Sequence, residues 1–379
     1  MNAQRRREAA DAAATFHVAM ILLGGKSFAA TMEMWTKVVP TEGRLEVSAS
    51  AFLGDALSTV RAHRHQVEII AISFMRLFRA LHTGFTFQNV MTGDAQTAVP
   101  LDILRRDFID ALGRYAPEVL ESSAIPDADP TDGVDEPEHV MHPDHTPIEP
   151  YEPDYSAADP DAIVERLEWL EDELDRLEDE LDQQINAIFE NIGHKSLELK
   201  VRKISEREKL TPREADALRE EAALKVGRRL AAHASRTTMN GGRNAEHSVG
   251  TRDERVLGFV RIHDPKGRPD VPCGFCALLM TRGFVEAPGK RRIYKSEKSA
   301  GGTPDEQGFS VDQYHSPDHC RAEQVYSLEQ VDEDPRFNAN RRLAELYSNR
   351  IRGKFSGDLA MSKWREIIST LRAGQESAW

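Results

Sequence analysis

Apolar residues recur every three or four positions through much of the first 120 residues, which is the period of an amphipathic helix. The clearest stretch covers residues 48–82, and its apolar positions are Val67, Ile70, Phe74, Leu77 and Leu81. Further helices are predicted over residues 9–24, 28–39 and 101–120. We therefore expect residues 1–120 to form a helical bundle with an ordinary apolar core.

A heptad pattern follows further along the chain, with apolar steps of 4, 3, 4, 3, 4, 4, 3 and 4 and one stutter after Leu181. Its members are Ile163, Leu167, Leu170, Leu174, Leu177, Leu181, Ile185, Ile188 and Ile192. Acidic residues fill most other positions, so the apolar stripe is narrow and needs a partner. That partner is another copy of the chain, the N-terminal bundle or the next helix.

The next helix is basic at its end. If the acidic helix folds back on it, the acidic and basic side chains of the two helices can compensate each other's charge. It begins at Thr211-Pro212-Arg213-Glu214, with Thr as N-cap, Pro at the first position and Glu at the third. The pattern predicts that it ends near Ala232. Self-association through residues 163–192 is the alternative.

The remaining sequence is mixed. It predicts a strand over 256–262, a turn over 264–267, a short helix over 276–280, a glycine-rich loop over 300–309, and helices over 327–352 and 356–372. The expected fold class is mainly α with a small α+β C-terminal domain. The expected divisions are a helical domain (1–120), an acidic linker (121–160), the heptad and basic helices (161–235), a Cys/His domain (236–352) and an amphipathic helix (353–379).

Charge changes this picture in two places. The formal net charge is −14, yet no Lys or Arg occurs from Tyr115 to Glu165, and residues 124–160 are rich in Pro and Asp. Such a segment cannot bury enough apolar surface to offset its ordering entropy, so we expect disorder there and solvated histidines at 139, 142 and 145. The overall acidity argues against non-specific binding to nucleic acid.

No apolar run reaches the roughly 18 residues of a membrane span, so we expect no membrane contact. The arginines at positions 5–7 precede a short apolar block, which we interpret as an intracellular helix and not as a signal sequence. An odd number of cysteines, three, favours a reducing compartment.

All three cysteines belong to one arrangement, Cys273-Gly274-Phe275-Cys276 and, about forty residues later, His315, His319 and Cys320. Two thiolates from one tight turn can reach the same metal ion, and zinc favours such ligands. The sequence therefore predicts a structural zinc site formed by Cys273, Cys276, Cys320 and either His315 or His319.

Other uses of these residues remain open. The Cys-x-x-Cys turn also suits thiol redox chemistry, although the expected β-α-β pattern upstream is missing. A cysteine hydrolase would use Cys273 or Cys276 as nucleophile, His315 as base and Asp318 to orient it, with Cys276, His315 and Asp318 as the leading catalytic set. Finally, the cysteines could be small buried apolar residues.

Several segments together resemble the MuF-like minor capsid proteins of tailed phages that infect actinobacteria. The segments are Arg252-Asp253, Gly258-Phe259-Val260-Arg261, the run from Cys273 to Gly283, Tyr314-His315, His319-Cys320, residues 74–84, and the final helix with Gly357, Trp364 and Arg365. In that family the pattern looks like W-x-R-V, C-x-F-C-A-M-L-A-S-R-G and Y-H-x-H-C-x-C. In this chain the two histidines are separated by two more residues than in that pattern. Ala322 stands in place of its last cysteine.

The resemblance implies a head morphogenesis protein inside the virion or procapsid, present in the host cytoplasm during assembly. Its expected partners are the phage portal protein and the scaffold or major capsid protein. Products of this family are often described as capsid maturation proteases, so a protease that cuts scaffold or head proteins is the alternative. A DNA-contacting ejection protein, using residues 290–298 with Arg228 and Arg229, is a third possibility, which the overall acidity disfavours.

Overall fold

The computed structural model describes residues 3–41, 44–90, 97–122, 161–207, 210–263, 271–281, 302–304, 310–312 and 320–373. The predictions for residues 124–160, 264–267 and 290–298 lie outside these ranges. Within them the chain is mainly helical with short strands, which confirms the expected fold class.

The helices are α1 (Ala3–Trp35), α2 (Leu45–Thr83), α3 (Leu101–Tyr115), α4 (Pro117–Ser122), α5 (Leu170–Ile188), the π-helix η1 (Phe189–Lys195), α6 (Ser196–Ser205), α7 (Pro212–Arg252), α8 (Gly274–Thr281), α10 (Leu328–Glu333), the 3-10 helix η2 (Pro335–Phe337), α11 (Asn338–Arg350) and α12 (Gly357–Arg372). The strands are β1 (Phe85–Phe87), β2 (Ala98–Pro100), β3 (Asp161–Glu165), β4 (Gly258–His263), β5 (Gly302–Pro304), β6 (Ser310–Asp312) and β7 (Cys320–Val325).

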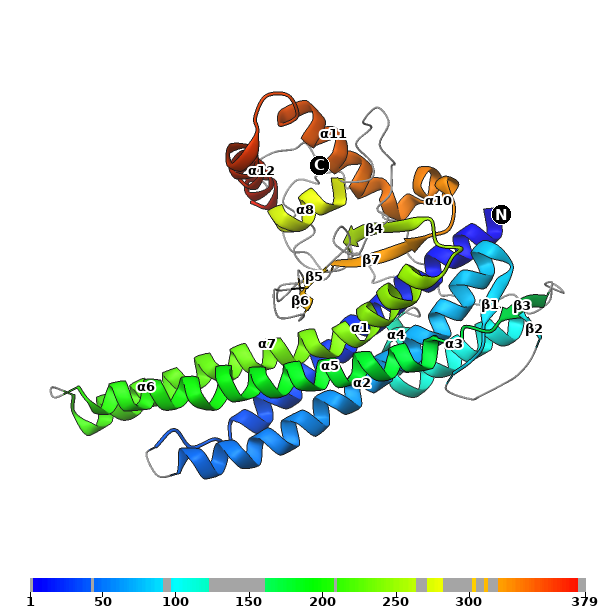
Figure 1. Cartoon of the computed structure of the whole chain (residues 1–379). Coiled ribbons are helices and arrows are strands. Elements are labelled where there is room, and N and C mark those ends of the chain that lie inside the picture. Colours follow the sequence, from blue (N-terminus) through cyan, green and yellow to red (C-terminus); the bar gives the residue numbers. More distant parts are fainter. Residues whose placement is uncertain are drawn as a thin grey trace, which may run out of the picture.

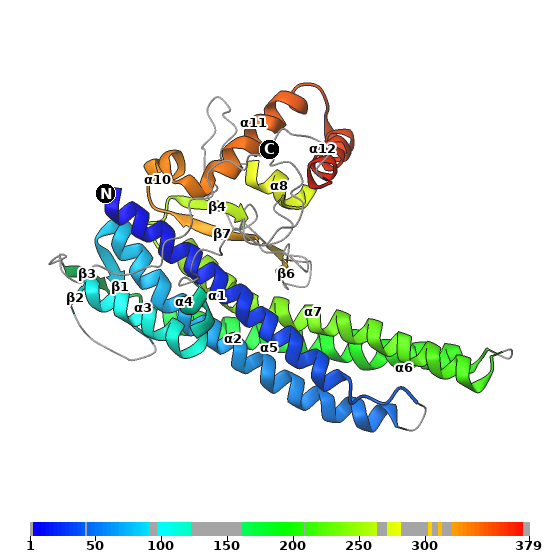
Figure 2. The same ribbon diagram turned by 180° about the vertical axis from the view of Figure 1, so that it is seen from behind.

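The molecule has a helical body and a smaller C-terminal domain. In the helical body, α1, α2, α7 and the continuous α5–η1–α6 run lie side by side, with α3, α4 and the strands β1–β3 toward one end (Figure 1). The C-terminal domain consists of β4, β7, α8 and α10–α12 and lies on one flank of the long helices, as the reverse view also shows (Figure 2). Helix α7 contributes to the whole length of the body and leads directly into the C-terminal domain.

Helix α1 is continuous where the sequence analysis expected two helices. By length and composition, residues Gln4–Trp35 would also suffice for a membrane span, with a mean hydropathy of 1.3 over an 18-residue window, although no apolar run of that length was expected there from the sequence. Half of that apolar stretch is buried in the helical body, where Phe16 and Leu23 are fully enclosed. A buried apolar face is what a core helix requires.

Strand β3 corrects the expected start of the heptad helix. It is the middle strand of a three-stranded sheet, parallel to β1 and antiparallel to β2, with Ile163 opposite both Phe85 and Ala98. Ile163 is 52% exposed and does not belong to the apolar stripe. The adjacent β-branched residues Ile163 and Val164 favour a strand. The period of so short an apolar run does not distinguish a strand from a helix.

From α5 onward the heptad positions are buried or, at Leu174, Ile188 and Ile192, partly buried. Leu177, Leu181 and Ile185 are 7%, 2% and 0% exposed, and α5 packs mainly against α7 and also contacts α2. Arg64 of α2 reaches across to Asp182 at 2.9 Å. The acidic helix therefore folds back on the basic one and on the N-terminal helices, and the apolar stripe is already covered in a single copy.

Helix α7 begins as the sequence predicts, with a Thr211–Glu214 capping box and Pro at the first turn, but it continues 20 residues beyond Ala232 to Arg252. The predicted end was wrong because the Gly-rich sequence that follows is a weak helix former. Packing supports the helix there instead. A Cβ at Gly242 would lie 2.7 Å from Val67 Cγ1, so the absence of a side chain lets α7 approach α2 closely.

Gly227→Ala tests the same kind of close packing near the start of α7, where this helix packs against Trp35 at the end of α1. A Cβ at Gly227 would lie 2.2 Å from Cδ1 of Trp35, a ring that is buried and donates a 2.7 Å hydrogen bond to Ala223 O. We expect the free energy of unfolding to fall by about 1–3 kcal/mol. Gly25→Ala is the matched control, since no atom lies within 4 Å of its added Cβ. Chemical denaturation should show it unchanged or up to about 1 kcal/mol more stable, and equal effects at the two sites would contradict the argument.

A buried set of charges joins the helical body to the C-terminal domain; we call it the charge junction. Arg321 of β7 is 0% exposed and donates to Glu246 of α7 at 2.8 Å and also to Glu323. Arg336 makes two further hydrogen bonds to Glu323. The Arg321 guanidinium also lies over the rings of Phe16 and Phe74. Because buried charges must be paired, the Arg321–Glu246 pair favours one position of β7 along α7.

The charge junction should make stability depend on pH through Glu246. Burial raises the pKa of Glu246 from 4.5 to about 7, against the opposing effect of Arg321. The folded protein therefore keeps a proton that the unfolded chain releases, so this group's contribution is complete below pH 4.5 and is lost as the pH rises through 7. The loss is about 3 kcal/mol.

Glu246→Gln cannot ionise and should lack this dependence. Denaturant midpoints measured from pH 5 to pH 8 should therefore fall less steeply for this variant than for the wild type. Glu220→Gln, at an exposed position of the same helix, should parallel the wild type. Parallel curves for Glu246→Gln and the wild type would contradict the assignment.

Candidate functional site

The three cysteines lie together in the C-terminal domain, as expected from their scarcity. Cys276 and Cys320 are fully buried and form one cluster, against which Cys273 and Phe275 pack. Cys273 immediately precedes α8 and Cys276 lies in its first turn, so both thiols lie at the same end of the helix. Cys320 is the first residue of β7, and its position brings the distant end of the motif to this point.

Hydrogen bonds connect these thiols with two residues of β4. The Cys276 backbone N–H donates to Cys273 Sγ at 3.4 Å, and Arg261 Nη2 donates to Cys276 Sγ at 3.4 Å. His263, on the same strand as Arg261, places its Nδ1 3.3 Å from Sγ of Cys320 on β7. Arg261 is 1% exposed, so its charge faces the sulfur atoms and not solvent.

Arg261 and His263 were not among the site residues predicted from the sequence. Both lie on β4, which pairs antiparallel with β7 so that His263 faces Cys320 and Arg261 faces Ala322. Residues opposite each other in an antiparallel pair have their side chains on the same side. Recognising His263 would have required the register of two strands 57 residues apart, which no local pattern encodes.

Burial makes Cys276 a poor nucleophile. A hydrogen bond with Cys273 lowers the pKa of the Cys276 thiol. A hydrogen bond with Cys320 and burial together raise that pKa by more, so it lies well above the ordinary value. A nucleophilic cysteine needs thiolate character and access to a substrate. The other members of the predicted catalytic set, His315 and Asp318, lie outside the described residues, so the set as a whole stays a prediction.

The zinc site also stays a prediction. His319, like His315, lies outside the described residues, so the sequence-based ligand set cannot be assembled from them. Within the described ranges, no three or more His, Cys, Asp or Glu side chains are arranged around a metal position as they stand. The three thiols nevertheless satisfy the first requirement of the predicted site, which is that both halves of the motif meet.

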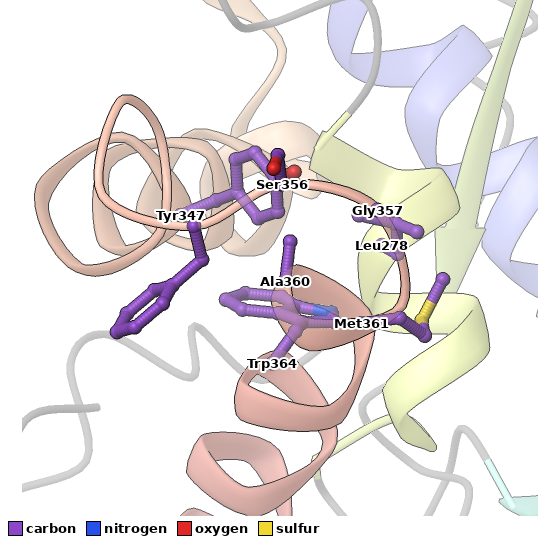
Figure 3. Close-up of a pocket in the computed structure, with 8 residues that line it drawn as sticks. Leu278, Tyr347, Ser356, Gly357, Ala360, Met361 and Trp364 are labelled. Carbon is purple, nitrogen blue, oxygen red and sulfur yellow. The ribbon is translucent and has the colours of Figure 1, made fainter.

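A small hollow of mixed polarity lies between α8, α11 and the start of α12 (Figure 3). It measures about 180 Å³, and its lining includes Leu278, Tyr347, Ala360, Met361 and Trp364. Pockets for drug-sized ligands are typically about 300 Å³ or larger, so this hollow is too small for such a ligand.

Helix α12 packs against the Cys273–Cys276 turn and makes a hydrogen bond to its backbone. Trp364 is fully buried, and its Nε1 donates a 2.9 Å hydrogen bond to the carbonyl of Gly274, between the two cysteines. A Cβ on Gly274 would lie 3.0 Å from Arg365 Cγ, which is tight enough to favour glycine at this position. The Cys-x-x-Cys turn is thus held by the last helix of the domain.

A family model described as VG15 protein matches residues 172–349. The matched stretch begins in α5, ends in α11 and includes all three cysteines. This match indicates a phage-associated protein. No curated protein and no solved structure was found to match the chain.

Proposed function

We propose that this chain is a minor head protein of a tailed phage, MuF-like in its C-terminal domain, that attaches at the portal or the inner capsid surface during head assembly. The observation that carries the proposal is an overlap. The stretch matched by the phage family model contains residues 236–326, which carry the resemblance to MuF-like proteins.

The architecture supports an adaptor better than an enzyme. Cys276 and Cys320 are fully buried, Cys273 is partly buried, and the pKa of the Cys276 thiol is raised. The buried charge junction fixes the C-terminal domain to long helices whose polar faces remain exposed. Such a molecule offers its helical body and its C-terminal domain for separate contacts, as a protein that joins two components of a particle requires.

Co-expression with the other head proteins of the same phage tests the proposal. The tagged full-length chain should co-purify with the portal protein, or should be found in few copies inside procapsids assembled with portal, scaffold and major capsid protein. Its absence from both the portal fraction and the particles would contradict the proposal.

The same experiment addresses proteolysis. Head proteins in these particles should keep their full lengths, and Cys276→Ala should not alter the pattern of fragments. If the wild type produces fragments of scaffold or capsid protein that Cys276→Ala does not, while Cys276→Ala stays folded, then the protease alternative is correct.

A further inference from the structure

The strand pair places an imidazole directly against the thiol cluster. His263 and Cys320 are opposite residues of β4 and β7, and His263 Nδ1 lies 3.3 Å from Cys320 Sγ. A nitrogen and a sulfur bound to the same tetrahedral zinc ion lie about 3.5 Å apart, given bond lengths near 2.0 and 2.3 Å. This pair therefore already has the separation that a shared zinc ion needs.

The other two sulfur atoms approach the same place from α8. Cys276 packs against Cys320, and Cys273 Sγ accepts a hydrogen bond from the Cys276 backbone. A cysteine side chain moves its sulfur by rotation about a single bond, so the three thiols can turn toward one ion. Three sulfur ligands with one imidazole nitrogen form a set that zinc prefers.

The charge of such a site would also be balanced. Zinc with three thiolates and a neutral imidazole carries roughly one net negative charge. Arg261 supplies a buried positive charge, and its Nη2 lies 3.4 Å from Cys276 Sγ. A buried anionic centre would be costly without such a partner.

We propose that Cys273, Cys276, Cys320 and His263 bind one structural zinc ion, and that His263 is the nitrogen ligand in place of His315 or His319. The ion would tie the start of α8 to the ends of β4 and β7. This assignment is independent of where the protein acts, so it would hold even if the chain has no role at the portal.

Metal analysis of the full-length protein, purified without chelator and under reducing conditions, tests the proposal. The wild type should contain about one zinc ion per chain, and its cobalt-substituted form should show thiolate-to-cobalt charge transfer with tetrahedral d–d bands. His263→Ala should weaken zinc binding by about 100-fold or more in a chelator competition. His315→Ala and His319→Ala should bind as the wild type does.

His263→Cys keeps the test decisive if His263→Ala fails to fold. A fourth thiolate should preserve zinc binding and raise the charge-transfer intensity of the cobalt form by about a third. The proposal is overturned by a metal-free wild type, by unchanged cobalt spectra in His263→Cys, or by loss of zinc on changing His315 or His319 with retention in His263→Ala. Failure of the portal experiment leaves each of these results unaffected.

Discussion

Trp364→Ala should destabilise the C-terminal domain by about 3–5 kcal/mol, the range for removing a fully buried large aromatic side chain. The indole is enclosed, contacts the Tyr347 ring edge-on at a centroid distance of 5.3 Å, and donates to Gly274 O. Its loss removes a central member of the apolar cluster that joins α8, α11 and α12. Because that cluster supports the cysteine turn, the turn should loosen with it.

The loss should be local to the C-terminal domain. Limited proteolysis should cut Trp364→Ala within α8, α11 or α12 while the helical body stays intact, and thiol labelling of Cys276 should become faster. Leu359→Ala is the control on the same helix, since Leu359 is 56% exposed and should change stability by less than about 0.5 kcal/mol. Wild-type labelling rates in Trp364→Ala would show that α12 does not hold the turn.

Arg321→Met should cost about 3–5 kcal/mol at pH 8, where Glu246 is ionised, because it leaves that buried carboxylate without its cation. Glu246 is 2% exposed and cannot recover its hydration, whereas Glu323 keeps its two hydrogen bonds from Arg336. The methionine replaces much of the apolar stem of the arginine, so the loss reports mainly on charge. Thermal and chemical unfolding should both show it, and Arg228→Met at an exposed position of α7 should be close to neutral.

A double variant separates pairing from packing. If the cost of Arg321→Met arises from an unpaired Glu246, then adding Glu246→Gln should recover part of the loss, a positive coupling in a double-mutant cycle. Strictly additive effects would instead show that Arg321 acts through its contacts with the Phe16 and Phe74 rings.

Periodicity predicted the parts of the fold in which burial follows the sequence. The stripe through Leu177, Leu181 and Ile185 is buried where the heptads place it, and the capping box at Thr211 starts α7. Ile163 did not follow the heptads, because β3 forms only by pairing with two strands that precede it by more than 60 residues. Helix propensity also gave the wrong end for α7, because Gly242 lies inside the helix, where the close approach of α2 leaves no room for a side chain.

The candidate site shows the same division. Scarcity of cysteine and the Cys-x-x-Cys spacing were sufficient to predict that Cys273, Cys276 and Cys320 meet. The neighbouring His263 and Arg261 were not predictable, because their proximity arises from strand register and not from spacing. The predicted roles of His315, His319 and Asp318 remain predictions, since these residues lie outside the described ranges.

The central place of β3 in its sheet has a consequence for a broken chain. Residues on either side of the 123–160 stretch are anchored independently, Pro117–Ser122 as helix α4 and Asp161–Glu165 between β1 and β2. A peptide bond cut between Ser122 and Asp161 would therefore divide the covalent chain without separating its two pieces. The nicked protein would migrate as two bands in denaturing gels and still elute as one particle in native buffer.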